Sequence, residues 1–132
     1  MKRSGIYVVG FFALLFMCSC MDAMGVAKIK MLNQSSYNLR LNFEVAPYYE
    51  DDQYKNVDIR QNDSVSIEML AFNYVCNPND EVKKIIFSNL DTEEIIKEMV
   101  TDKNTFEKTG KARWKAYYLL EITDDLLDLN EN

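Results

Sequence analysis

Residues 37–45 read YNLRLNFEV, and apolar and polar side chains alternate through the whole stretch. A period of two is typical of a β-strand with one face in the core and one face in water. This run is the clearest local pattern in the chain and predicts a half-buried antiparallel strand. The side chains expected to face inward are Tyr37, Leu39, Leu41, Phe43 and Val45.

A second alternating stretch lies near the C-terminus, at residues 112–123, ARWKAYYLLEIT. It predicts another long strand, and we expect one of its faces to join the same core as residues 37–45. Basic residues surround this stretch, and Trp114 and Tyr117 lie among them. We interpret the basic residues as charge on a strand face. The residues expected to face inward are Trp114, Ala116, Tyr118, Leu120 and Ile122.

Shorter strands are predicted between these two, separated by clusters of turn residues. Residues 101–111 are expected to form a polar loop, with Phe106 inserted into the core and Gly110 at a turn. The expected short strands are 26–32, 56–60, 64–70 and 81–88, and the expected turns are 33–36, 61–63 and 77–80.

Residues 91–100 are compatible with two structures. Asp91 or Thr92 can cap a helix, or the segment can pair with residues 84–88 as a hairpin. We favour the hairpin because the surrounding segments are strands. About seven short strands then predict an all-β fold, an antiparallel sandwich or open barrel, with a short helical turn at residues 126–129.

The N-terminus has the features of a secretory signal peptide. Lys2 and Arg3 precede an unbroken apolar run at residues 6–17, IYVVGFFALLFM. As a helix this run is about 18 Å long, whereas a spanning helix must cross about 30 Å of hydrocarbon. We therefore predict a cleaved signal peptide at residues 1–19, and a short retained anchor is the alternative.

Two cysteines close the apolar run, at Cys18 and Cys20. The stretch Met17-Cys18-Ser19-Cys20 resembles the lipobox of bacterial lipoproteins, in which a cysteine after a small residue is acylated, for example with palmitate. Cys20 follows Ser19, so the resemblance implies lipidation at Cys20; cleavage without lipidation is the alternative. A tether at 20–25 and one domain at 26–132 would follow. Residues 20–132 lack Lys2 and Arg3 and therefore have 13 basic and 21 acidic residues, a net charge of −8.

Composition excludes several classes of function. The 132 residues contain no His, which removes Ser-His and Cys-His nucleophile pairs and His-ligated metals. An acidic domain is a poor partner for nucleic acid. No phosphate-binding, nucleophile-elbow or C-x-x-C motif follows residue 20, and Cys76 is predicted to be a buried, unreactive thiol. We expect no catalytic residue, no metal, no cofactor and no enzymatic activity.

The loop at residues 46–55 holds the candidate binding residues. Tyr48, Tyr49 and Tyr54 flank the acidic run 50–52, so a phenol face could dock a sugar ring. Clustered oxygens can also hold Ca²⁺, but the run lacks the spacing of an EF-hand loop. The alternative is a solvated loop whose tyrosines cover the sandwich edge. The paired acids at 93–94 and 124–125 are expected to be surface charge or capping groups.

Five short patterns complete a resemblance to small lipoproteins of Bacteroides-type Gram-negative bacteria. The resemblance implies an immunoglobulin-like sandwich in the cell envelope, held at the outer membrane on its surface or periplasmic face. We expect a non-enzymatic binding module for a glycan or protein; the alternative is a structural or assembly subunit. The patterns are at residues 33–36, 62–67, 85–88, 104–106 and 118–124.

Overall fold

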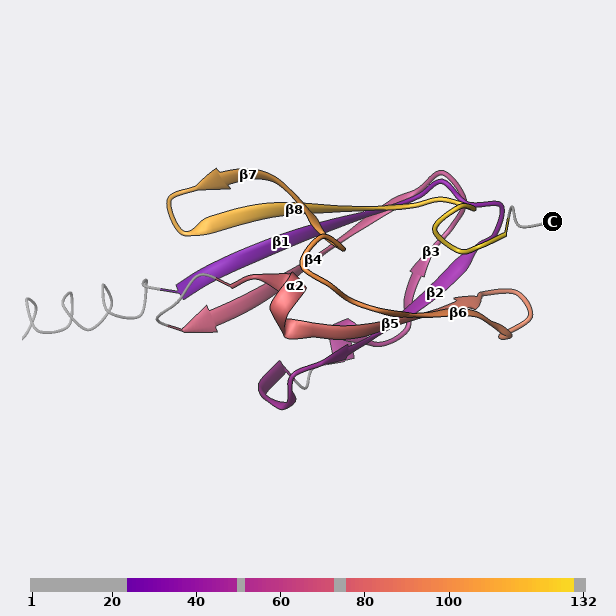
Figure 1. Ribbon diagram of the computed structural model, residues 1–132, viewed down its shortest axis with the longest axis horizontal. Coiled ribbons are helices and arrows are strands. Elements are labelled where there is room, and N and C mark those ends of the chain that lie inside the picture. Colours follow the sequence, from indigo (N-terminus) through magenta and orange to yellow (C-terminus); the bar gives the residue numbers. More distant parts are fainter. Residues whose placement is uncertain (1–23, 50–51, 73–75, 130–132) are drawn as a thin grey trace, which may run out of the picture.

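The computed structural model describes residues 24–49, 52–72 and 76–129, and these form two four-stranded β-sheets packed face to face (Figure 1). The first sheet has the order β4-β1-β8-β7 and the second has the order β3-β2-β5-β6. The predicted all-β sandwich is therefore confirmed. Its elements are β1 (Met24–Asn33), β2 (Leu39–Val45), η1 (Pro47–Tyr49), η2 (Asp52–Tyr54), β3 (Val57–Ile59), β4 (Ser64–Phe72), α2 (Pro78–Glu81), β5 (Val82–Asn89), β6 (Ile95–Val100), β7 (Glu107–Ala112) and β8 (Lys115–Ile122).

The core lies between the two sheets and is built from every second residue of the strands. The alternation in residues 37–45 places Leu39, Leu41 and Phe43 in this core, although Tyr37 lies before β2 and is exposed. Burying apolar side chains in this way supplies most of the favourable free energy of folding. The largest fully buried apolar side chains are Phe87, Phe106, Ile29, Met31, Leu39, Leu41, Ile59, Met69, Ile85, Ile122 and Val82.

One pair of strands departs from the expected antiparallel arrangement. β1 and β8 run parallel, with Val26 opposite Lys115 and Asn33 opposite Ile122. All other strand pairs are antiparallel. Alternation in a sequence sets which face of a strand is buried, but it does not set the direction of the neighbouring strand.

The segment that was compatible with two structures forms a hairpin. β6 pairs antiparallel with β5, and the side chain of Asn89 accepts hydrogen bonds from the N–H groups of Asp91 and Thr92 at 2.9 and 3.3 Å. Glu93 has φ of 64°, in the left-handed region that a tight turn uses. Asn89 therefore stabilises a turn at the place where a helix would have to begin.

Residues 101–115 correct the sequence prediction. The expected polar loop contains the strand β7, and the expected long strand is divided by a turn at Arg113 and Trp114, so that β8 begins at Lys115. Trp114 is 54% exposed, not in the core. β7 is polar and exposed along almost its whole length, so it carries no hydrophobic alternation to reveal it. Phe106 is buried as predicted.

The described residues begin close to the predicted start of the domain and include its last turn. β1 begins at Met24, inside the expected tether 20–25, whereas the signal peptide 1–19 and Cys20 lie outside the described residues. No helix in the described ranges has the length and apolar character needed to cross a bilayer. At the C-terminus the N–H of Leu127 donates to the carbonyl of Thr123 at 3.2 Å, which forms the expected single turn.

The end of the sandwich at the β1–β2 turn is closed by a buried asparagine. The amide of Asn33 donates to the carbonyls of Tyr37 and Ile59, both at 2.8 Å. Its side-chain oxygen accepts from the N–H and hydroxyl of Ser35 at 3.0 and 2.6 Å. All the hydrogen-bonding capacity of this amide is used, which makes its complete burial tolerable.

Candidate functional site

The three tyrosines predicted to bind a ligand do not share one surface. Tyr48 is 68% exposed, but Tyr49 and Tyr54 are only 6% and 3% exposed and belong to the hydrophobic core. The rings of Tyr49 and Tyr54 meet edge to face with centroids 6.2 Å apart. An aromatic ring needs an open face to stack on a sugar, so the expectation of a joint three-ring platform is corrected by this burial.

Polar contacts explain why this loop turns inward. The hydroxyl of Tyr49 lies 3.5 Å from the sulfur of Cys76, and that of Tyr54 donates to the carbonyl of Glu68 at 3.4 Å. Tyr48 donates to the carboxylate of Glu81. The loop thus covers the edge of the sandwich, as the alternative interpretation expected, while residues 50–51 lie outside the described residues.

Cys76 is buried, as predicted. Burial raises the pKa of its thiol more than the hydrogen bond with Tyr49 lowers it, and the Glu81 carboxylate adds a smaller increase. A raised pKa keeps the sulfur protonated at neutral pH, where the nucleophilic form is the thiolate. Cys76 therefore has the surroundings of a packing residue.

The paired acids occupy turns, in agreement with the expectation. Asp124 accepts hydrogen bonds from the N–H and hydroxyl of Ser36, and these bonds lower the pKa of Asp124. Glu93 and Glu94 lie in the β5–β6 turn and are exposed. Within the described residues, no cluster of three or more Cys, Asp or Glu side chains is arranged to hold a metal ion.

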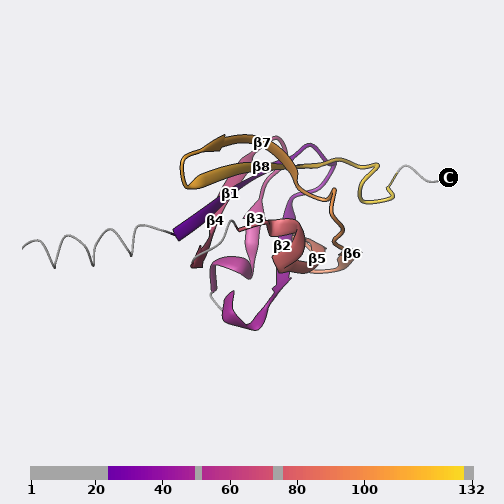
Figure 2. The same ribbon diagram turned by 60° about the vertical axis from the view of Figure 1, so that its left-hand side comes forward.

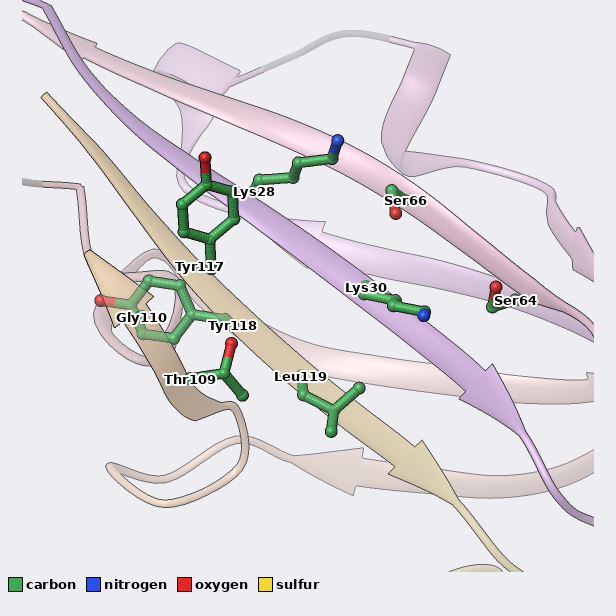
Figure 3. A pocket seen from close by; sticks show the side chains of 9 residues that line it. All are labelled: Lys28, Lys30, Ser64, Ser66, Thr109, Gly110, Tyr117, Tyr118 and Leu119. Atoms are coloured by element: carbon green, nitrogen blue, oxygen red, sulfur yellow. The ribbon is translucent and has the colours of Figure 1, made fainter. Parts of the chain in front are cut away.

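A shallow hollow of about 680 Å³ lies on the outer face of the first sheet (Figure 3). It crosses β4, β1, β8 and β7. In Figure 3 the side chains of Lys28 and Lys30 extend from β1 toward β4, and the ring of Tyr117 stands on β8 beside them. The hollow is lined by Lys28, Lys30, Ser64, Ser66, Thr109, Gly110, Tyr117, Tyr118 and Leu119.

Strand register explains how these side chains meet. Lys28 lies opposite Tyr117 on β8, and Lys30 lies opposite Ser66 on β4. A shift of register between Lys108 and Gly110 leaves Thr109 without a partner on β8. Such a bulge bends an edge strand and redirects its side chains, here along the rim of the hollow.

The polar groups of this hollow are available to a ligand. Among the described residues, neither Lys28 nor Lys30 forms an ion pair, and the hydroxyls of Ser64 and Ser66 make no side-chain hydrogen bond to another described residue. The nearest carboxylate across the register from Lys28 is Glu68, which is bonded to Lys115 at 3.0 Å. The result is a positive floor with free hydroxyls.

Aromatic groups give the hollow one apolar wall. Tyr117 is 37% exposed, and the ammonium group of Lys115 lies 5.9 Å from its ring centroid, within the range of a cation–π contact. Tyr118 also lines the hollow, although its side chain is largely buried. Burial raises the pKa of its phenol, so the phenol is neutral at neutral pH.

A second hollow, of about 840 Å³, lies beside α2 and the start of β7. Its asparagines are largely committed to the fold: Asn79 donates to the carbonyl of Phe106 at 3.0 Å and accepts from its N–H at 2.7 Å. The side chain of Asn77 accepts from the N–H of Asn79. This hollow holds charges of both signs, whereas both charged residues that line the hollow on the first sheet are lysines, so that hollow is the better candidate for an anionic ligand.

The sequence predicts strands for the lining residues from β1, β4 and β8 and a loop for Thr109 and Gly110, and it does not reveal the site. The alternation of Lys28 and Lys30 and the outward position of Ser64 and Ser66 were visible in the sequence. What joins them is the order β4-β1-β8-β7, which no local pattern reveals. Neither a comparison with protein-family models nor a search of curated proteins finds a match for this chain.

Proposed function

We propose that this chain is a lipid-anchored, extracytoplasmic binding module without enzymatic activity, and that its ligand is a glycan carrying carboxylate or sulfate groups. The observation that carries the ligand class is the hollow on the first sheet. It joins Lys28 and Lys30, which form no ion pair with a described residue, to an aromatic wall at Tyr117.

Each part of the hollow suits a different part of an acidic sugar. Lys28 and Lys30 are two residues apart on one strand, so their Cα atoms are about 7 Å apart and can face two anionic groups of a chain. The ring of Tyr117 offers an apolar face, and the hydroxyls of Ser64 and Ser66 can exchange hydrogen bonds with sugar hydroxyls. A shallow, open shape suits a polymer more than a small enclosed substrate.

The anchor rests on the N-terminal sequence. Cys20 follows the small residue Ser19 at the end of the apolar run, and the first strand begins only four residues later, at Met24. Labelled palmitate should enter the wild-type chain and be absent from Cys20→Ala. Equal labelling of the two chains would exclude lipidation at this residue.

Ligand binding is tested with an array of acidic and neutral glycans. The double variant Lys28→Gln/Lys30→Gln should lose at least about tenfold in affinity for acidic glycans, since each lost charge contact contributes about 1 kcal/mol or more. Lys83→Gln/Lys103→Gln makes the same change of net charge at exposed positions outside the hollow and should bind normally. Tyr48→Ala should also bind normally. Equal binding by both double variants would contradict the proposal.

The alternative function, an assembly subunit, is favoured by a different feature. β6 is the edge strand of the second sheet, and Ile95 and Val100 on it are 62% and 76% exposed. An edge strand with exposed apolar side chains can pair with a strand of another chain. Ile95→Lys/Val100→Lys should then abolish cross-linked complexes in intact envelopes, and a protein that is monomeric there would remove this alternative.

A further inference from the structure

The turn between β7 and β8 is an exposed basic and aromatic tip. Lys111, Arg113 and Trp114 are exposed there, and Leu70 at the adjacent end of β4 is 45% exposed. We propose that this tip is a second, separate contact surface, which rests on the headgroup region of the lipid bilayer and fixes the orientation of the domain on the membrane.

The tip lies beside the start of the first strand. The N–H of Val26 donates to the carbonyl of Trp114 at 2.8 Å, and Val26 lies opposite both Leu70 and Lys115 in the register of the sheet. Figures 1 and 2 both show the start of β1, the end of β4 and the β7–β8 turn together at one end of the molecule. These three segments therefore form one surface.

The length of chain before β1 places this surface close to a membrane. The inference rests here on the proposed lipid at Cys20. Val26 follows Cys20 by six residue steps, and a fully extended chain of that length reaches about 21 Å at most. The backbone of Trp114, hydrogen-bonded to Val26, therefore lies only a few ångströms beyond this reach at most.

The chemistry of the tip fits a bilayer surface. Residues 108–120 contain four basic and no acidic residues, in a domain whose overall charge is negative. Neither Lys111 nor Arg113 forms an ion pair with a described residue, so both are available to lipid phosphates. Tryptophan combines an apolar ring with an N–H donor and is enriched at membrane–water interfaces for that reason.

The outer-face hollow and the tip differ in what they are suited to bind. The hollow has hydroxyls and a tyrosine on a sheet face, whereas the tip has a large apolar ring that projects at the end of a hairpin. With the tip on the bilayer, the outer face of the first sheet stands upright and stays accessible to a glycan.

Trp114 is the single tryptophan of the chain, so intrinsic fluorescence reports on this residue alone. The full-length protein, expressed in cells and recovered from their membranes, is reconstituted into vesicles of phosphatidylethanolamine and phosphatidylglycerol with brominated acyl chains. Trp114 should lose roughly half of its emission relative to vesicles of unbrominated lipid, because an interfacial indole approaches the brominated chains.

A matched reporter is placed at the opposite end of the sandwich. In Trp114→Phe/Tyr37→Trp the indole moves to the β1–β2 turn, where Tyr37 is 39% exposed. This reporter should keep its emission in brominated vesicles and be quenched by aqueous iodide. Lys111→Gln/Arg113→Gln should reduce the quenching of Trp114 by brominated lipid while the protein still sediments with the vesicles.

Three results would overturn the inference. If the protein sediments with vesicles but Trp114 is as open to iodide as the Tyr37→Trp reporter, the membrane contact is wrong and the anchor stands. If both reporters are equally quenched by brominated lipid, the domain has no preferred orientation. If the protein does not sediment at all, the anchor and the membrane contact are both wrong.

Discussion

The two ends of the sandwich are built in opposite ways. At the β1–β2 end, Asn33 is completely buried with every hydrogen bond made, and Asp124 binds the neighbouring turn through Ser36. At the β7–β8 end, Arg113 and Trp114 are exposed and make no polar side-chain contact with a described residue. The same two strands, β1 and β8, connect the closed end to the open end.

This difference separates stability from interaction. Polar groups that hydrogen-bond to one another inside the fold have no donors or acceptors left for a partner. Removing one of them leaves its neighbours without a hydrogen bond. Groups that point into water cost little to replace but are free to bind. Substitutions at the two ends should therefore differ in their effect on folding, and the following predictions test that difference.

The largest effect is expected at Asn33. Asn33→Ala leaves the buried carbonyls of Tyr37 and Ile59 without their donor, so the free energy of unfolding should fall by about 2–4 kcal/mol. Urea denaturation followed by circular dichroism measures the change. Gln34→Ala, at the exposed next residue, should cost less than about 0.5 kcal/mol. Equal effects of the two substitutions would contradict the account of the closed end.

A smaller, pH-dependent effect is expected at Asp124. Its pKa is lowered in the folded protein by the bonds from Ser36, so its contribution to stability is present above the unfolded pKa of about 4 and is lost as pH falls through the folded value. Asp124→Asn should therefore be less stable than wild type at pH 7, and the difference should shrink below about pH 4.

Ser36→Ala removes the hydroxyl donor from the other side of this contact and serves as the companion variant. Denaturation of both variants between pH 7 and pH 3 gives the comparison. A difference from wild type that stays constant over this range would exclude the ionised Asp124 as its source.

The smallest effect on folding is expected at the open end. Trp114→Ala should change the free energy of unfolding by less than about 0.5 kcal/mol, since more than half of the side chain is already in water. A loss of more than about 2 kcal/mol would mean that the indole packs as a core residue. The indole of Trp114 would then be unavailable for contact with a membrane.

How far the sequence predicts the fold depends on the pattern in each strand. β2 and β8 alternate strongly, and their buried residues from Leu39 to Phe43 and from Ala116 to Ile122 were predicted correctly. β7 is polar on both faces and escaped prediction. The alternation of residues 112–123 also predicts a strand through Trp114, whereas Arg113 and Trp114 form the turn before β8.

The candidate site was less predictable than the fold. The tyrosine loop is local in sequence, but burial of Tyr49 and Tyr54 depends on the core that the distant strands create. The hollow has the reverse problem, because Ser64, Lys28 and Tyr117 become neighbours only through the pairing of β4, β1 and β8. Side chains without a local motif are grouped by topology alone.

The parallel pairing of β1 and β8 has a mechanical consequence. A force that pulls on the start of β1 and the end of β8 acts along both strands in opposite directions, because Val26 and Ile122 lie at opposite ends of the ladder. All the hydrogen bonds between the two strands then bear the load together, in shear, and do not open one after another. A domain tethered at its first strand and pulled from its last would resist extension as a single unit.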